Sequence, residues 1–134
     1  RYIAMNVRQD LPLCRALVSE TGGEAAAAPE DTAALTRLFA SARLTVSMRL
    51  HALTLSYLAG TPAFGIDGDG RIAAFAKECG IPYRTVEECE DIAAALEEAL
   101  TAETPDAAIW NERLAAGRAA LARALRAPEK EKEK

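Results

Sequence analysis

The sequence predicts an α/β fold, namely a Rossmann-like parallel sheet with helices on both of its faces. Short apolar runs of strand length alternate with longer segments whose apolar residues recur at helical spacing. Glycines and Asp-Gly pairs separate these segments, as turns between strands and helices require. The 134 residues, half of them hydrophobic, are enough for one domain.

Four segments are predicted to be strands because they are mostly apolar or β-branched: residues 2–7, 44–47, 61–66 and 83–86. Strands that are apolar along their length are typical of a parallel sheet that is buried on both faces. Ligands bind such sheets beyond the carboxyl ends of the strands, so we expect function there. The alanine-rich residues 24–29 fit no element well.

The helices are predicted from apolar stripes and from the residues that begin and end them. Asp31 or Thr32 can cap the second helix, and Cys79 lies on the apolar stripe of the fourth, where it fills the core. Residues 50–59 are apolar almost all round, which indicates a buried helix. The predicted helices cover residues 13–18, 32–42, 50–59, 72–79, 88–101 and 105–126.

Composition excludes several classes of function. The net charge of −4 gives no overall attraction to nucleic acid. The chain has no apolar run long enough to span a membrane and begins with no signal-peptide pattern. Its three cysteines lack CxxC spacing, so neither disulfides nor zinc are predicted and a cytoplasmic setting is expected.

No cofactor and no metal are predicted either. The sequence contains no GxGxxG and no P-loop pattern. The segment Asp67-Gly68-Asp69-Gly70 fails as a calcium loop because Ile72 stands where the loop needs glycine. We therefore predict a strand-to-helix turn here, with Asp69 as a candidate side chain facing the site.

The most informative segment joins a predicted strand to a buried helix and contains Ser47, Arg49 and His51. The amides at the start of a helix attract anions, and the Arg49 guanidinium suits a carboxylate or a phosphate. His51, the only histidine, can act as an acid or a base near neutral pH. The alternative is structural, with Arg49 in a salt bridge and His51 as a helix cap.

Arg8 follows the first predicted strand, so we expect it at the same sheet edge as Arg49. Two arginines that converge on one crevice would hold a doubly charged anion. An ordinary surface arginine is the alternative for Arg8 considered alone.

These residues are part of a longer pattern: SMRLHAL at residues 47–53, AGTPAFGI at 59–66 and DGRIAAFA at 69–76. Over residues 35–82 the chain resembles the C-terminal half of polysaccharide pyruvyl transferases, most closely the bacterial branch that pyruvylates secondary cell-wall polymers. Arg8 fits a further arginine of that family.

The resemblance implies a two-domain fold like that of type B glycosyltransferases. In this interpretation residues 1–127 are the C-terminal, phosphoenolpyruvate-binding domain, residues 128–134 are a charged disordered tail, and the N-terminal domain is absent from this chain. The fragment alone is then expected to be inactive. The family setting is the cytoplasm, where the enzyme can also associate peripherally with the membrane.

The resemblance also implies an activity. The family transfers the enolpyruvyl group of phosphoenolpyruvate to a sugar of a cell-wall polysaccharide precursor, including lipid-linked acceptors, and forms a pyruvate ketal. Arg8, Arg49, Leu50 and His51 occupy positions that the family uses to bind phosphoenolpyruvate. Arg49 and His51 are the predicted catalytic residues, with His51 as an acid or an electrostatic group.

The chain departs from the family pattern at two places. Gly68 and Gly70 stand where the family has Tyr and Pro, which removes an aromatic wall from the predicted turn. Residues 22–29 are also shorter than the family pattern, which carries a strand and an aspartate there. Two other functions stay open: the donor domain of a nucleotide-sugar glycosyltransferase, and a non-catalytic Rossmann-like interaction module.

Overall fold

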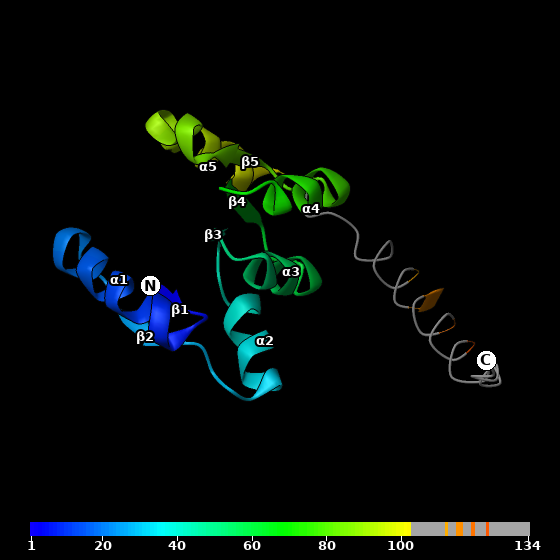
Figure 1. Cartoon of the computed structure of the whole chain (residues 1–134), viewed down its shortest axis with the longest axis horizontal. Helices are drawn as coiled ribbons and strands as arrows, with labels where there is room; N and C mark the ends of the chain where they lie inside the picture. Colours follow the sequence, from blue (N-terminus) through cyan, green and yellow to red (C-terminus); the bar gives the residue numbers. More distant parts are fainter. Residues whose placement is uncertain (103–111, 113–114, 117–118, 120–122, 124–134) are drawn as a thin grey trace, which may run out of the picture.

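The computed structural model describes residues 1–102 together with residues 112, 115, 116, 119 and 123. Strands and helices alternate along this part of the chain, as the sequence predicts (Figure 1). The strands are β1 (Tyr2–Ala4), β2 (Ala25–Ala27), β3 (Thr45–Ser47), β4 (Ala63–Asp67) and β5 (Tyr83–Thr85). The helices are α1 (Val7–Thr21), α2 (Thr32–Ala40), α3 (Leu50–Leu58), α4 (Arg71–Cys79) and α5 (Ile92–Thr101), with a 3₁₀ helix, η1 (Val86–Asp91), before α5.

The strands of the described chain pair in parallel, which confirms the predicted α/β class. β1 pairs with β2, while β3, β4 and β5 form a second sheet in that order. The single sheet that we expected is therefore divided, and Figure 1 shows β1, β2 and α1 as a group beside the rest.

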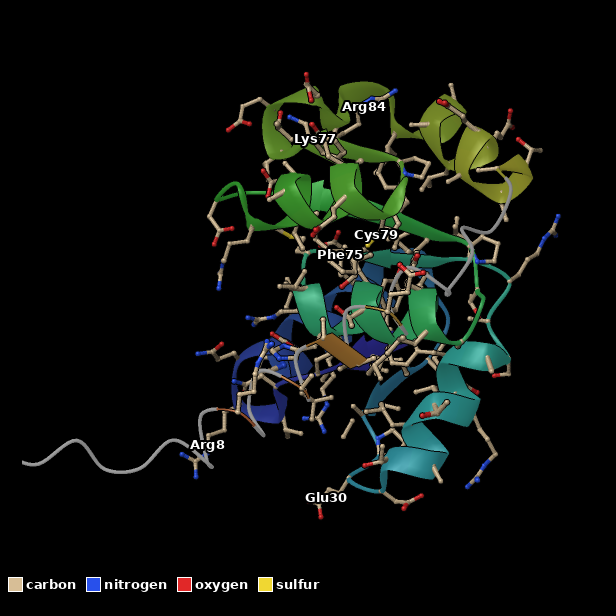
Figure 2. The ribbon with its side chains drawn as sticks, turned by 90° about the vertical axis from the view of Figure 1, so that its right-hand side faces the viewer. Arg8, Glu30, Phe75, Lys77, Cys79 and Arg84 are labelled. Atoms are coloured by element: carbon tan, nitrogen blue, oxygen red, sulfur yellow. The ribbon has the colours of Figure 1, made fainter. Side chains whose placement is uncertain are left out.

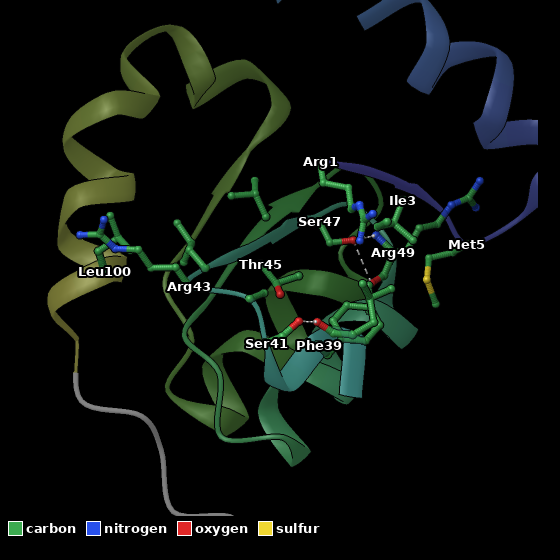
Figure 3. Close-up of a pocket in the computed structure, with 15 residues that line it drawn as sticks. Arg1, Ile3, Met5, Phe39, Ser41, Arg43, Thr45, Ser47, Arg49 and Leu100 are labelled. Carbon is green, nitrogen blue, oxygen red and sulfur yellow. Dashed lines mark hydrogen bonds between the residues drawn. The ribbon is translucent and has the colours of Figure 1, made fainter. Parts of the chain in front are cut away.

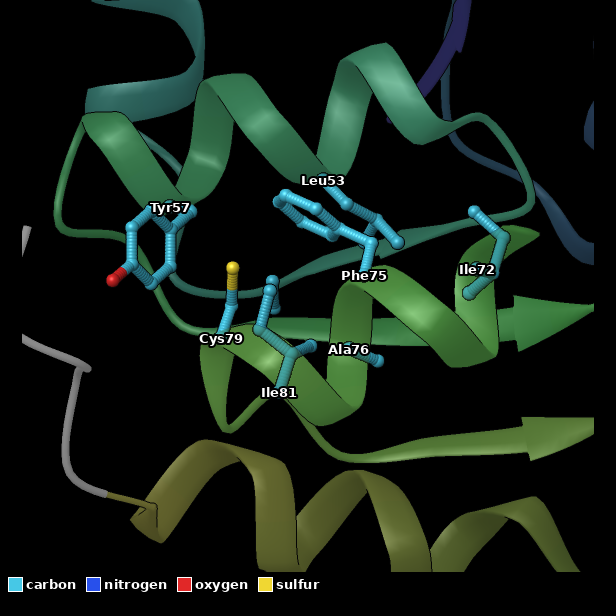
Figure 4. Packing of buried hydrophobic residues seen from close by; sticks show 8 residues of the cluster. Leu53, Tyr57, Ile72, Phe75, Ala76, Cys79 and Ile81 are labelled. Carbon is cyan, nitrogen blue, oxygen red and sulfur yellow. The ribbon is translucent and has the colours of Figure 1, made fainter. Parts of the chain in front are cut away.

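Helices cover both faces of the second sheet, because successive residues of β4 point to opposite sides. On one side Ala63 joins a core cluster with residues of α3 and α4, and on the other Phe64 packs against Ala95 and Ala99 of α5. Figure 4 shows the first cluster between α3 and α4. Its buried members are Leu53, Tyr57, Ala63, Ile72, Phe75, Ala76, Cys79 and Ile81, so the predicted stripe of α4 and the core position of Cys79 are confirmed.

α1 begins earlier than the sequence predicts. Asn6 accepts hydrogen bonds from the amides of Arg8 and Gln9, and its own amide donates to Asp10 at 2.8 Å. These caps start the helix at Val7, so the expected strand over residues 2–7 ends at Ala4. Arg8 consequently lies in the first turn of a helix rather than just past a strand.

A strand is present in the alanine-rich segment that fits no predicted element well. Residues 25–27 pair in parallel with β1, with Ile3 opposite Ala26. The alanines give no local strand signal, but pairing with β1 stabilises the extended conformation. Residues 25–27 therefore form a strand although their side chains do not predict one.

The remaining predicted elements agree with the structure, with shifted ends. Asp31 caps α2 by accepting from the amide of Ala34 at 2.7 Å, as predicted. The helix predicted over residues 88–101 divides into η1 and α5. Most of the helix predicted over residues 105–126, with Trp110, and the tail 128–134 lie outside the described residues. No helix in the described part of the chain is long and apolar enough to cross a membrane.

Candidate functional site

The link between β3 and α3 holds Arg49 in a fixed backbone conformation. The Ser47 hydroxyl accepts from the Arg49 amide at 2.9 Å and donates to the Arg49 carbonyl at 3.3 Å. Arg49 is the residue that caps α3, but its side chain accepts no hydrogen bond from the first turn of this helix. The positive end of α3 is therefore available to an anion. His51 does not cap the helix, so that structural alternative is wrong.

The Arg49 side chain reaches the first turn of α1. Its Nη2 donates to the Gln9 side-chain oxygen at 3.2 Å and forms an ion pair with Asp10. The Arg49 side chain remains 47% exposed, whereas that of Asp10 is only 17% exposed. The predicted structural alternative of a salt bridge is thus present, yet much of the guanidinium is still open to solvent.

Asp10 is held as the anionic partner of this pair. Burial by itself would raise the pKa of the Asp10 carboxyl. The hydrogen bond from Arg49, the backbone hydrogen bonds and the positive charge of Arg49 outweigh it, so the pKa lies below its usual value. Asp10 is a residue that sequence reasoning missed. Its position in the first turn after a capping Asn6 was a signal for helix capping, but not for a contact with Arg49.

Among the described residues, the Arg49 side chain bonds to Gln9 and Asp10 and to none of the other predicted residues. Arg8 and His51 are exposed, each second in its helix, and neither side chain has a hydrogen bond or ion pair among the described residues. Figure 2 shows Arg8 at the margin of the molecule. Leu50 packs against the core cluster of α3 and α4, so it holds the start of α3 on the sheet.

Asp69 lies on the neighbouring strand-to-helix turn and is engaged with its own helix. Its carboxylate accepts from Arg71 Nε at 2.8 Å and from the Arg71 amide at 3.2 Å. The side-chain hydrogen bond from Arg71 lowers the pKa of Asp69. Asp67 is the buried carboxylate of this turn and accepts from the amides of Gly70 and Ile72, so it begins α4.

A cavity of about 700 Å³ separates β1 from β3, and Arg49 is one of the residues that line it (Figure 3). Ile3 and Met5 form one wall, and residues 44–47 form the opposite wall. From the cavity, the chain continues to β2 on the side of β1 and to β4 on the side of β3, so the two connections run in opposite directions. In open α/β sheets, ligands bind at the point where the direction of the connections changes in this way.

The arrangement therefore brings a half-exposed guanidinium, a free helix terminus and a nearby imidazole to the carboxyl ends of β1 and β3. This set of groups can bind a small dianion and supply a proton. In the described part of the chain, no cluster of histidines, cysteines and carboxylates has the geometry of a metal site.

Comparison with known families places this site within a matched segment. The family model described as polysaccharide pyruvyl transferase matches residues 8–70, a range that includes Arg8, Arg49 and His51. No curated protein and no solved structure gives a significant match. The family indicates a polysaccharide pyruvyl transferase activity, with a sugar of a polysaccharide as the acceptor. Residues 8–70 of this chain therefore match the polysaccharide pyruvyl transferase family, as the motif around Arg49 and His51 predicts.

Proposed function

We propose that this chain binds phosphoenolpyruvate at the carboxyl ends of β1 and β3, for transfer of its pyruvyl group to a sugar. The observation that carries the proposal is the position of Arg49. It stands in the matched family segment, at the uncapped start of α3 and at the edge of the cavity between the two sheets. The guanidinium and the helix start favour an anionic ligand, and the cavity gives it space.

The charges of phosphoenolpyruvate match the groups available. The ligand carries a carboxylate and a phosphate. The free donors of the Arg49 guanidinium suit one of them, and the first amides of α3 suit the other. Arg8 lies in the first turn of α1, next to the Gln9 and Asp10 that Arg49 contacts, and would add charge when a dianion binds.

The chemistry that follows needs a proton donor close to the enol carbon. In our proposal one sugar hydroxyl adds to C2 of the enolpyruvyl group while the CH₂ carbon gains a proton and becomes a methyl group. A second hydroxyl of the same sugar then bonds to C2 as the C2–O bond to phosphate breaks. The proton of this second hydroxyl goes to the departing phosphate, which leaves as inorganic phosphate, and the ketal remains. His51, exposed in the first turn of α3, is our candidate for delivering the proton or for stabilising the departing phosphate.

The acceptor side of the reaction goes beyond these residues. We propose a sugar of a cell-wall polysaccharide precursor, lipid-linked or free, as the acceptor, in line with the bacterial branch that the motifs resemble. A second domain like that of type B glycosyltransferases would hold it over the carboxyl edge of the sheet. Residues 1–127 would then be the donor-binding half of the enzyme, working in the cytoplasm at the membrane surface.

The proposal is tested by titrating the ¹⁵N-labelled chain with phosphoenolpyruvate, inorganic phosphate and a uridine diphosphate sugar in separate nuclear magnetic resonance experiments. We expect saturable shifts with phosphoenolpyruvate at the amides around residues 49–52. Arg49→Ala is expected to weaken binding by at least tenfold, because it removes a charged hydrogen-bond donor. Arg37→Ala, an exposed arginine on α2 with the same change of charge, is the matched control and should leave binding unchanged.

Two results would overturn the proposal. Saturation by the uridine diphosphate sugar but not by phosphoenolpyruvate would favour the donor domain of a glycosyltransferase. Binding of none of the three ligands up to millimolar concentration would favour a non-catalytic interaction module.

A further inference from the structure

Arg49 and Asp10 differ in how tightly each is held. Asp10 is largely buried and both of its oxygens are occupied: Oδ2 accepts from the Asn6 amide at 2.8 Å, and Oδ1 pairs with Arg49. Asn6 in turn is fixed by the amides of Arg8 and Gln9. The carboxylate is thus part of the rigid start of α1, whereas Arg49 reaches it from a separate element across the cavity edge.

The contact leaves most of the guanidinium free. An arginine has five N–H donors in a planar fork, and Arg49 uses those of Nη2 for Gln9 and Asp10. Nε and Nη1 have no partner among the described residues. Since the side chain is 47% exposed, these atoms can meet a ligand from solvent while Nη2 stays anchored.

An anchored arginine binds an anion better than a loose one. A free arginine loses rotamer entropy when it is fixed. Part of that cost falls away when a carboxylate already holds the side chain in place. The partner must itself be rigid, and the two tied oxygens of Asp10 meet this condition.

We propose that Asp10, assisted by Gln9, is a positioning residue that orients the Arg49 guanidinium for phosphoenolpyruvate. The inference rests on the proposed function of Arg49. In this proposal Asp10 acts by orienting Arg49 and does not itself contact the ligand. The opposite role would be that of a competitor, in which Asp10 occupies Arg49 until the ligand displaces it. If Asp10 positions Arg49, removing its carboxylate weakens binding of the ligand. If Asp10 competes with the ligand, removing its carboxylate strengthens binding.

The experiment measures the dissociation constant for phosphoenolpyruvate and the melting temperature for each variant of the whole chain. Asp10→Asn is expected to raise the dissociation constant about tenfold, because it removes a charge-assisted hydrogen bond from Arg49. Gln9→Ala leaves the hydrogen bond between Asp10 and the Asn6 amide intact and is expected to raise the dissociation constant about twofold. Asp10→Glu keeps the charge and should recover part of the affinity.

A double-mutant cycle separates positioning from general destabilisation. In an Arg49→Lys background, where binding is weakened but measurable and the planar fork is absent, Asp10→Asn should have no more than a twofold effect. Asp31→Asn, which weakens the cap of α2, is the matched control. It should lower the melting temperature without changing the affinity.

The outcomes distinguish the two proposals. If Arg49→Ala weakens binding as expected, equal affinity of wild type and Asp10→Asn, or tighter binding by Asp10→Asn, would overturn the positioning role alone. If Arg49→Ala binds as tightly as wild type, the proposed function itself fails, whatever Asp10 does.

Discussion

Gly65, in the middle of β4, allows α4 to lie close to the sheet, and its replacement by alanine has a predictable cost. A Cβ at this position would lie 2.6 Å from Ile72 Cγ2, 3.2 Å from Tyr83 Cβ and 3.4 Å from Leu53 Cδ1. Ile72 is 3% exposed and lies in the first turn of α4. The Cβ of Tyr83 cannot move without its backbone, and Ile72 Cγ2 can move only by rotation of a buried, β-branched side chain, so Ile72 must leave its rotamer or α4 or β5 must shift.

The magnitude follows from these contacts. Overpacking a buried site by one methyl group costs about 1–3 kcal/mol. Alanine recovers up to about 1 kcal/mol by restricting the unfolded chain. We therefore expect Gly65→Ala to lower the free energy of unfolding by about 1–2 kcal/mol, which corresponds to a melting temperature lower by about 4–8 °C.

The assay is urea denaturation followed by circular dichroism, with Gly68→Ala as the matched control. The nearest atom to a Cβ at Gly68 is Val86 Cγ2, at an ordinary 3.9 Å, so that variant should be within about 0.5 kcal/mol of wild type. Equal stabilities of Gly65→Ala and Gly68→Ala would refute the packing argument.

Two further predictions concern carboxylates. Asp67→Ala should lower the free energy of unfolding by about 2 kcal/mol, because the buried Asp67 accepts hydrogen bonds from the amides that begin α4. Asp69→Ala should change the free energy of unfolding by less than about 0.5 kcal/mol. Equal losses for the two variants in urea denaturation would contradict this prediction. The pKa of Asp10 is depressed in the folded state, so its stabilising contribution is present above its unfolded pKa, about 3.9, and is lost as the pH falls through the lower folded pKa. The stability difference between wild type and Asp10→Asn should therefore shrink between pH 6 and pH 3, and a constant difference across that range would show that the charge of Asp10 does not stabilise the fold.

The elements that the sequence predicts well are those whose signal is local. The stripe of Ile72, Phe75 and Cys79 sits at helical spacing, and all three side chains are buried in one cluster. The cap at Asp31 is read directly from residue type. A strand at residues 25–27 could not be found in this way, because alanine has no strand preference and the segment is extended only where β1 pairs with it.

The same distinction between local signals and distant contacts applies to the candidate site. The position of Arg49 and His51 at the start of α3 follows from the strand and helix patterns on either side of them. The contact of Arg49 with Asp10 joins residues 39 positions apart, so no local pattern could reveal it. The expected convergence of Arg8 with Arg49 depended on a strand that ends at Ala4 instead, and whether a ligand brings the two arginines together stays a prediction.

The separation of β1, β2 and α1 from the second sheet has a consequence for how the chain opens. Within the described residues these three elements make their main contacts with one another, and Arg49 supplies their hydrogen bonds to the rest. Such a group can unfold as a cooperative unit of its own, at a smaller free energy than the core around Phe64. Native-state hydrogen exchange should then show the amides of β1 and β2 exchanging together and before those of β4. Similar protection in the two groups would indicate one undivided unfolding unit.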